Sequence, residues 1–525
     1  MTAEGGRNPL VQVGLLLTAA ALASRALGWL RLLVIGAQFG ASSELDAYLA
    51  AFRIPDMIFQ LVVAGALSAA LIPVYASYRA RGEDQEAWAV AASIINLIVL
   101  ALAAISLVMA ILAPVLMPLI APGFDDPTTE LTVRLSRIML LSPVLIGTGA
   151  VVSGLLNSHY KFGAAAVAPL VYNLAIIGAA VLLAPVIGIE GLAVGVVIGA
   201  AGHLLIQLPS LVALRPTFTF RVDFGHPGVR RVGTLIGPRT FGLAAGQVNL
   251  IVSTILASGL AAGSITAFTY AFQLTQIPVG VIGVSVAVAL FPTLSRDAAL
   301  GRMSEIRRQV AGSVRVLVFI AAPLTALMIV LREPLTSVFF EYGRFSPQAA
   351  AETANALAFF ALGLIGHVVV HVLTRAFYAM QDTQTPVIWA VVAVVLNIGL
   401  MLALVGRMGV EGLALAISLS ATLEVAGLLW ALRTRIGSID GPEMAASAAR
   451  SAGAAVVAGV VMAAGLVALT TTAPGLDGDA LGRLVLFAVP AVAGSLAFLL
   501  AATALRSPEL VLMRREIGRY AGSRR

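Results

Sequence analysis

The stretch WAVAASIINLIVLALAAISLVMAILAPVLMP (residues 88–118) decides the fold class. It contains no charged side chain and is longer than the roughly 20 apolar residues that a helix needs to cross a membrane. Similar apolar runs follow one another along the chain, so short loops must join successive helices. We therefore predict an all-α polytopic membrane protein.

The composition excludes an ordinary soluble enzyme. Of the 525 residues, 59% are hydrophobic and 11% are charged, whereas a typical soluble domain has about 25% charged residues. No sizeable loop carries an acidic or histidine-containing catalytic cluster, so we do not expect an enzyme. The chain has no cysteine, which excludes disulfides and thiolate metal sites, and we expect neither a metal nor a cofactor.

We predict about fourteen membrane-spanning helices from the apolar runs and the charge clusters that separate them. The first run is not a signal peptide, because it contains Arg25 and Arg31 and leads directly into further apolar helices. The predicted limits are 10–39, 47–76, 88–118, 131–157, 163–187, 190–213, 235–259, 264–291, 311–331, 352–378, 384–405, 410–432, 444–470 and 481–505.

The positive charges predict the orientation in the membrane. The net charge is +7, and Lys161 is the only lysine, so arginine supplies nearly all of it. Arginines gather in alternate connections and in the C-terminal tail, while the opposite loops are short and more acidic. Positive loops stay in the cytoplasm, so both termini should be cytoplasmic. The same rule explains the basic balance better than nucleic-acid binding, and no nucleic acid is expected as a partner.

An internal repeat predicts the organisation of the helices. GIEGLAVG (188–195) returns as GVEGLALA (409–416), and AALIPVYAS (69–77) returns as VALFPTLS (288–295). Six helices separate equivalent points, so the two halves are parallel repeats, an arrangement typical of transporters. The predicted parts are an N-lobe (1–213, helices 1 to 6), a cytoplasmic linker (214–234), a C-lobe (235–432, helices 7 to 12), helices 13 and 14 (433–505) and a basic cytoplasmic tail (506–525).

Three arginines fall inside or at the edge of the first two spans. Arg25 and Arg31 lie in helix 1, and Arg53 lies near the start of helix 2. An intramembrane arginine costs about 2.5 to 3.5 kcal/mol, so it needs an anionic partner, a wet cavity or a bound anion. Local pairing with Asp46 and Asp56 is one interpretation. The other is a site for phosphate, which a guanidinium binds through two hydrogen bonds.

The second half carries fewer charges at equivalent positions. Gln273 stands where the repeat has Arg53. Arg239, at the start of helix 7, either faces a cavity or marks the cytoplasmic interface. Glu424 is an isolated carboxylate within helix 12 and is either a proton or cation site or a structural side chain.

Five motifs resemble the MurJ/MviN family, whose members are lipid II flippases of the MOP exporter superfamily. The match extends over helices 1 to 12 at consistent spacing, and the family also has fourteen helices. The motifs are SRALGWLRLLVIGAQFG (24–40), LDAYLAAFRIPD (45–56), GALSAALIPVYASY (65–78), IPVGVIGVSVAVALFPTLS (277–295) and FYAMQDTQTPV (377–387).

The resemblance implies two six-helix lobes around a cationic cavity, with helices 13 and 14 forming a groove for the polyprenyl tail. Arg25 and Arg31 match the family's cavity arginines, and Asp46 matches its aspartate before helix 2. Arg53 stands where a basic residue is usual. Asp382 lies near the coupling-cation site of some members.

Several charges that are common in the family are missing here. Phe59 and Gln60 replace basic residues, Gln273 replaces a cavity arginine, and Leu32 stands where an aspartate is common. Either the cavity charge has moved, with Arg239 as one candidate, or the substrate differs.

The expected function is translocation of the lipid-linked peptidoglycan precursor lipid II from the inner to the outer leaflet of the bacterial cytoplasmic membrane, by alternating access. An ion gradient of Na⁺ or H⁺, or the membrane potential, would drive it, and cell-wall synthesis proteins are expected partners. The alternatives are an exporter of another lipid-linked oligosaccharide and a non-transporting scaffold for cell-wall enzymes.

Overall fold

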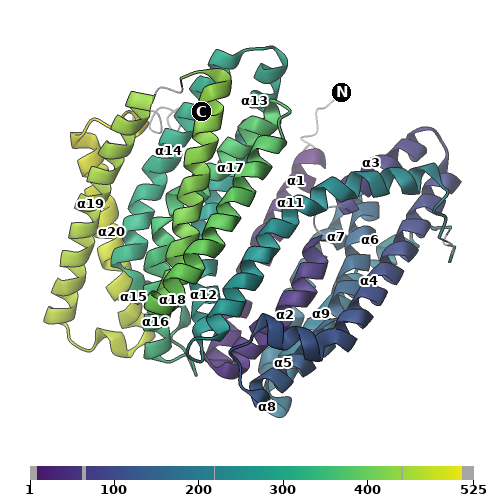
Figure 1. The fold of residues 1–525 in the computed structure, drawn as a ribbon, viewed down its shortest axis with the longest axis horizontal. Coiled ribbons are helices and arrows are strands. Elements are labelled where there is room, and N and C mark those ends of the chain that lie inside the picture. Colours follow the sequence, from purple (N-terminus) through teal and green to yellow (C-terminus); the bar gives the residue numbers. More distant parts are fainter. Residues whose placement is uncertain (1–8, 62–66, 218, 221, 439–440, 511–525) are drawn as a thin grey trace, which may run out of the picture. The chain divides into compact units, whose positions relative to one another are not determined.

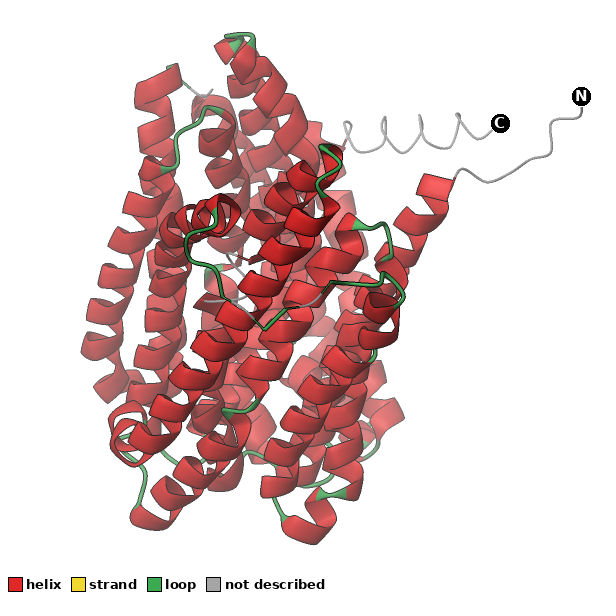
Figure 2. Ribbon diagram, turned by 90° about the vertical axis from the view of Figure 1, so that its right-hand side faces the viewer, coloured by secondary structure: helices red, strands yellow, loops and turns green. Residues whose placement is uncertain are grey.

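The computed structural model describes residues 9–61, 67–217, 219–220, 222–438 and 441–510. Within these ranges the chain forms helices and loops and no strand (Figure 2), which confirms the all-α prediction. Ala64 and Gly65 in the second predicted span, residues 1–8, and the tail beyond residue 510 lie outside the described residues.

The chain divides into two compact units. The first unit comprises residues 1–265 with the short loop 342–345, and the second comprises residues 266–341 and 346–525. This division differs from the predicted one, which placed the start of the second lobe at residue 235. The reason is that α11 (Pro227–Ser258) packs against α2, α3 and α4 of the first unit.

Side-chain caps define where helices of the first unit begin. The Ser42 hydroxyl accepts from the Leu45 N–H at the start of α2, and the Asp125 carboxylate accepts from the Thr128 N–H at the start of α5. With α11, the helices of this unit (Figure 1) are α1 (Pro9–Phe39), α2 (Ser43–Phe59), α3 (Leu67–Ala80), α4 (Asp84–Ile120), α5 (Asp126–Met139), α6 (Ser142–Ser158), α7 (Phe162–Leu182), α8 (Ala184–Ile187), α9 (Glu190–Leu205) and α10 (Leu208–Val212).

The helices of the second unit are mostly long and apolar. In α12–α13 the chain passes through a π-helical segment, η2, directly after Pro278. The elements are α12 (Ser264–Pro278, which begins at the unit boundary), η2 (Val279–Val284), α13 (Ser285–Ala299), α14 (Met303–Val330), α15 (Arg332–Phe340), α16 (Pro347–Leu362), α17 (Leu364–Ala379), α18 (Gln384–Ile436), α19 (Gly441–Thr472), η3 (Leu476–Gly478) and α20 (Ala480–Ala504).

One glycine divides the longest helix. Within α18 the backbone of Gly409 has φ 55° and ψ −131°, which is not helical, so α18 consists of two helices joined at this residue. The described residues contain ten helices long and apolar enough to cross a membrane, or eleven if the bent pair α16 and α17 is one span. The count of fourteen spans stays a prediction.

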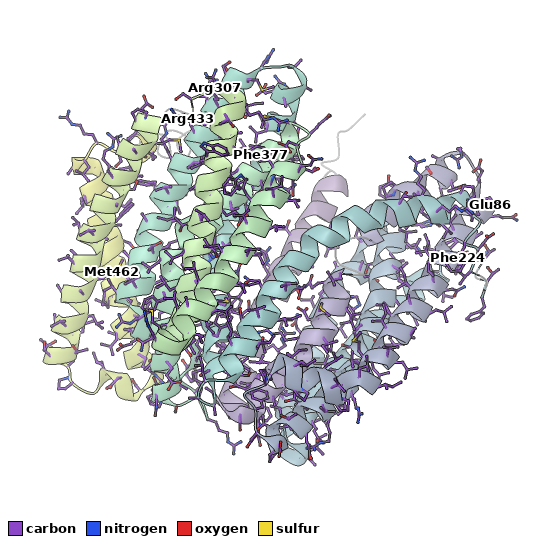
Figure 3. All side chains as sticks on the ribbon, viewed as in Figure 1. Glu86, Phe224, Arg307, Phe377, Arg433 and Met462 are labelled. Carbon is purple, nitrogen blue, oxygen red and sulfur yellow. The ribbon has the colours of Figure 1, made fainter. Side chains whose placement is uncertain are left out.

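Each unit has its own apolar core. In the first unit, Leu71, Tyr75, Val90 and Leu102 are fully buried between α3 and α4. In the second, Met462 of α19, labelled in Figure 3, packs on Gly494 of α20 so closely that a Cβ at Gly494 would lie 2.3 Å from it. Small residues therefore set the spacing of α19 and α20, as in many membrane helix pairs.

Candidate functional site

A half-open cavity of about 310 Å³ lies inside the first unit. Five helices, α1, α2, α6, α7 and α9, contribute side chains to it. The lining residues are Arg31, Phe52, Pro55, Asp56, Phe59, Ser142, Pro143, Ile146, Pro169, Tyr172 and His203. An apolar cavity with a few convergent polar groups is the usual form of a small-molecule or headgroup site.

Prolines open the helices around this cavity. Pro55 lies within α2 and Pro169 within α7, while Pro143 occupies the first turn of α6. A proline inside a helix has no N–H and displaces the preceding turn, which leaves a carbonyl without its helical donor. In α7, the Asn173 side chain donates to the Pro169 carbonyl at 3.0 Å. This bond fixes the Asn173 side chain on the proline-containing turn of α7.

Two arginines supply the positive charge of this region. The Arg31 guanidinium lies over the Tyr172 ring, with 5.9 Å between Cζ and the ring centroid. Arg53 Nε donates to Thr254 Oγ1 of α11 at 2.9 Å. A guanidinium stays ionised when it is desolvated, so both side chains keep their charge in this setting. Arg31, unlike Arg53, lines the cavity.

Asp56 supplies the negative charge. Its carboxylate lines the same cavity, accepts a hydrogen bond from the Gln60 side chain and interacts electrostatically with Arg53 and Arg31. The predicted local pairing of arginines with Asp56 therefore describes part of the site. Gln60, one turn later, is the neighbour that hydrogen-bonds this carboxylate.

A row of polar side chains leads away from the cavity between α9 and α6. His203 Nδ1 lies 3.5 Å from Gln207 Nε2, and the same Gln207 nitrogen donates to the His203 carbonyl at 2.8 Å. Ser153 Oγ of α6 donates to Gln207 Oε1 at 2.7 Å. Gly149 makes room for the imidazole, because a Cβ there would lie 2.5 Å from His203 Nδ1. His203 is thus fixed at the cavity by its neighbours.

Asp46 and Arg25 lie outside the group of residues that line this cavity. Asp46 is 2% exposed, and its Oδ2 accepts from the Gly263 N–H at 2.7 Å. This contact ties the start of α2 to the turn after α11. Arg25 is exposed on α1, two turns before Arg31. Their predicted role in substrate binding stays a prediction.

The predicted site residues of the second lobe are less informative. The side chain of Arg239 in α11 lies outside the described residues. Gln273 is exposed on α12. Arg375 of α17 lies over the Phe291 ring, 5.2 Å from Cζ to the centroid. The structure brings together Arg31, Arg53 and Asp56, and it leaves the second-lobe part of the site as a prediction.

The residues predicted for a coupling ion occupy different settings. Asp382 accepts from the Gln384 and Thr385 N–H groups at 3.0 Å, from the Thr385 hydroxyl at 2.6 Å and from Arg435. Glu424 is half-buried in α18. No group of three or more histidine, aspartate or glutamate side chains is placed to hold a metal ion within the described ranges. An ion at Asp382 would have to compete with Arg435.

Burial, hydrogen bonds and charge act together on Asp382, which lies in the loop before α18. Burial opposes ionisation of this carboxyl, but hydrogen bonds from Thr385 and Gln384 and the charge of Arg435 outweigh it and lower its pKa. The group is therefore a charged cap for the first turn of α18 at neutral pH.

Sequence reasoning missed Tyr172 and His203. Both are single polar residues in apolar runs, so periodicity gives no reason to place them at one site. A search for aromatic or histidine side chains at the level of the intramembrane arginines would have found them.

The apolar spans define a multi-pass membrane protein, and its fold is shared with membrane transporters. A solved structure described as an inward-facing multidrug resistance MATE family transporter of the MOP superfamily has a TM-score of 0.65 with this chain, at 16% identity, and covers 78% of this chain and 94% of the other. At this identity the likeness shows the fold alone.

Comparisons of sequence then show the family. The family model described as "Lipid II flippase MurJ" matches residues 35–475, so the chain belongs to the MurJ family. The Burkholderia cenocepacia lipid II flippase MurJ is 32% identical over 426 residues, covering 79% of this chain and 82% of that protein. A probable lipid II flippase MurJ of Rhizobium meliloti is 30% identical, covering 78% and 79%. A structure of lipid II flippase MurJ in an inward closed conformation has a TM-score of 0.78 at 23% identity, covering 93% and 98%.

Proposed function

We propose that this protein is a flippase that translocates lipid II from the inner to the outer leaflet of the bacterial cytoplasmic membrane. The family match over residues 35–475 carries this proposal. The arginine-bearing cavity supports it, because the diphosphate of such a precursor needs positive charge within the membrane.

The cavity supports a transport mechanism that needs no covalent chemistry, so the protein acts as a transporter and not as an enzyme. Arg31 would bind diphosphate oxygens through two parallel N–H donors. The polar headgroup would cross through the protein while the polyprenyl tail stays in lipid. Gly409 in α18 and Pro278 before η2 supply breaks at which helices bend during alternating access.

We infer that both termini face the cytoplasm, from the arginine distribution. An ion gradient of Na⁺ or H⁺, or the membrane potential, would drive transport. Cell-wall synthesis proteins on the cytoplasmic side are the proposed protein partners.

One observation favours a second candidate function. Gln273 is uncharged where the family has a cavity arginine, so a related lipid-linked oligosaccharide, or a scaffold role without transport, fits a weaker cationic site.

Complementation of a bacterium depleted of its own lipid II flippase separates these functions. We expect growth together with appearance of lipid II in the outer leaflet, measured by its accessibility to an external lipid II-degrading enzyme. An Arg31→Ala variant at equal membrane level serves as the control. Growth without outer-leaflet lipid II would indicate the scaffold role, and neither growth nor lipid II would indicate another substrate.

A further inference from the structure

The cavity of the first unit holds a carboxylate, Asp56, as well as the guanidinium of Arg31. Asp56 and Arg31 line the same space of about 310 Å³, and the carboxylate lies within the electrostatic reach of the guanidinium. Within the part of the chain that the structure describes, Asp56 is the only carboxylate that lines it. An anion that binds Arg31 must therefore share this space with a carboxylate.

The other charged and titratable groups around Asp56 come from four of the surrounding helices. Helix α6 contributes Ser142 and Ile146, which do not titrate, and the Arg53 partner on α11 is the hydroxyl of Thr254. The groups are Arg31 on α1, Arg53 and Tyr48 on α2, Tyr172 on α7 and His203 on α9.

The size of the cavity makes the repulsion strong. A sphere of about 310 Å³ is roughly 8 Å across, which is comparable to the Debye length of about 8 Å at physiological salt. A bound diphosphate and an ionised Asp56 would repel each other across apolar walls, where the effective dielectric constant is far below that of water. Neutralising Asp56 removes this repulsion and leaves the charge of Arg31 to the ligand.

We propose that binding of a diphosphate headgroup in this cavity is coupled to uptake of one proton by Asp56. The inference rests on the proposed flippase function and names a counter-ion exchange at its site. Without a ligand, the ionised carboxylate balances the charges of Arg53 and Arg31, and in the loaded state the diphosphate takes its place at Arg31. The proton comes from bulk water.

The test is the pH dependence of binding of a farnesyl-tailed lipid II analogue to the purified full-length protein in detergent, between about pH 6 and pH 9. The diphosphate diester keeps a constant charge over this range. If binding takes up one proton, the affinity for the analogue falls by up to about tenfold for each pH unit above the pKa of Asp56. We expect the Asp56→Asn variant to bind the analogue about tenfold more tightly at pH 8 than the native protein does. Its affinity should no longer depend on pH, so the slope of affinity against pH is lost.

Glu130→Gln is the matched control, since Glu130 is an exposed carboxylate on α5 of the same unit. It should keep the native slope. An Asp56→Asn slope equal to that of the native protein overturns the coupling and leaves the flippase function standing. If His203→Gln loses the slope while Asp56→Asn keeps the native slope, the proton is taken up by the imidazole. That result also overturns the proposal.

Proton uptake by the native protein gives a second measurement that does not depend on a variant folding. Addition of the analogue in weakly buffered detergent at about pH 8 should take up about one proton per molecule bound, read with an indicator dye. Binding without uptake overturns the coupling. A native protein that binds no analogue at any pH contradicts the proposed function itself, and the coupling falls with it.

Discussion

The Arg31 guanidinium lies over the ring of Tyr172, 5.9 Å from Cζ to the ring centroid. This cation–π contact joins α1 to α7 at the wall of the cavity. The face of the ring attracts the cation without neutralising it, so the N–H donors of Arg31 stay available to an anionic ligand. Tyr172 therefore orients Arg31 while the charge itself stays available for binding.

Replacing Arg31 with alanine should abolish flippase activity and leave the membrane level of the protein unchanged. The reason is that the charge of Arg31 binds the ligand and contributes little to the stability of the fold. Arg31→Lys should restore activity only partly, since an ammonium lacks the planar pair of donors. Complementation growth and immunoblotting of membranes measure the two effects. We predict the same for Arg25. Full activity of both alanine variants would leave these arginines only a structural role.

Arg239→Gln should impair complementation more than Arg407→Gln, because Arg239 lies within α11, the helix equivalent in the repeat to helix 1. Arg407, exposed on α18, is the control. Gln273→Arg should be tolerated or improve growth, since it restores a positive charge that is usual in the family. Equal, near-native growth of the two Gln variants would reject the idea that cavity charge has moved to Arg239.

The C-terminal tail should be inaccessible from outside the cell. The native chain has no cysteine, so a single Tyr520→Cys substitution gives a unique label site. An impermeant maleimide should label it only after the membrane is permeabilised. A cysteine at Asp477, in a predicted external loop, is the comparison and should react in intact cells. Labelling of position 520 in intact cells would reverse the proposed orientation.

Acid should destabilise the second unit through Asp382. Its pKa in the folded protein lies below the usual value of about 4, so its stabilising effect is full above that value and is lost as the pH falls through the folded-state pKa. The thermal unfolding midpoint in detergent should decrease when the pH is lowered below about 4. Asp382→Asn should weaken this dependence, whereas Asn at the exposed Asp477 should not. Asp382→Ala also removes the cap and should lower the free energy of unfolding by about 1 kcal/mol.

Gly409→Ala should destabilise the protein by about 1 to 3 kcal/mol, because φ 55° with ψ −131° is open to glycine but strained for other residues. Gly406→Ala is the matched control. Gly406 lies three residues earlier in α18, is exposed and has open space at its Cβ. Alanine there should be neutral or stabilising, since it favours a helix. Equal unfolding midpoints would show that the break at Gly409 is not strained.

Hydropathy predicted the long helices well where they stand as continuous apolar runs. The predicted limits 10–39, 444–470 and 481–505 correspond to Pro9–Phe39, Gly441–Thr472 and Ala480–Ala504. The separation of 384–405 from 410–432 corresponds to the break at Gly409 in α18. In these segments local composition is sufficient, because each helix satisfies its own backbone hydrogen bonds in lipid.

Breaks within spans and the grouping of helices could not be read in this way. The predicted span 131–157 corresponds to one apolar segment, Asp126–Ser158, which has a break between α5 and α6 that was not predicted, and α11 begins at Pro227, inside the predicted linker. The His226 imidazole caps α11 through the Gly228 N–H and lies 3.0 Å from Glu86 (labelled in Figure 3), a contact between residues far apart in sequence. Such long-range contacts, like the shared position of Tyr172 and His203 at the cavity, produce no pattern in the local sequence.

The hydrogen bond between Asp46 and the Gly263 N–H has a consequence for biogenesis. Its two residues are 217 positions apart, so at a synthesis rate of about 5 to 20 residues per second the donor emerges roughly 10 to 40 s after the carboxylate. During that interval most of the first unit has already been made while one of the partners of Asp46 does not yet exist. The start of α2 therefore gains this contact only after α11 has been made, and a ribosome that stalls before Gly263 leaves a membrane intermediate in which Asp46 lacks this partner.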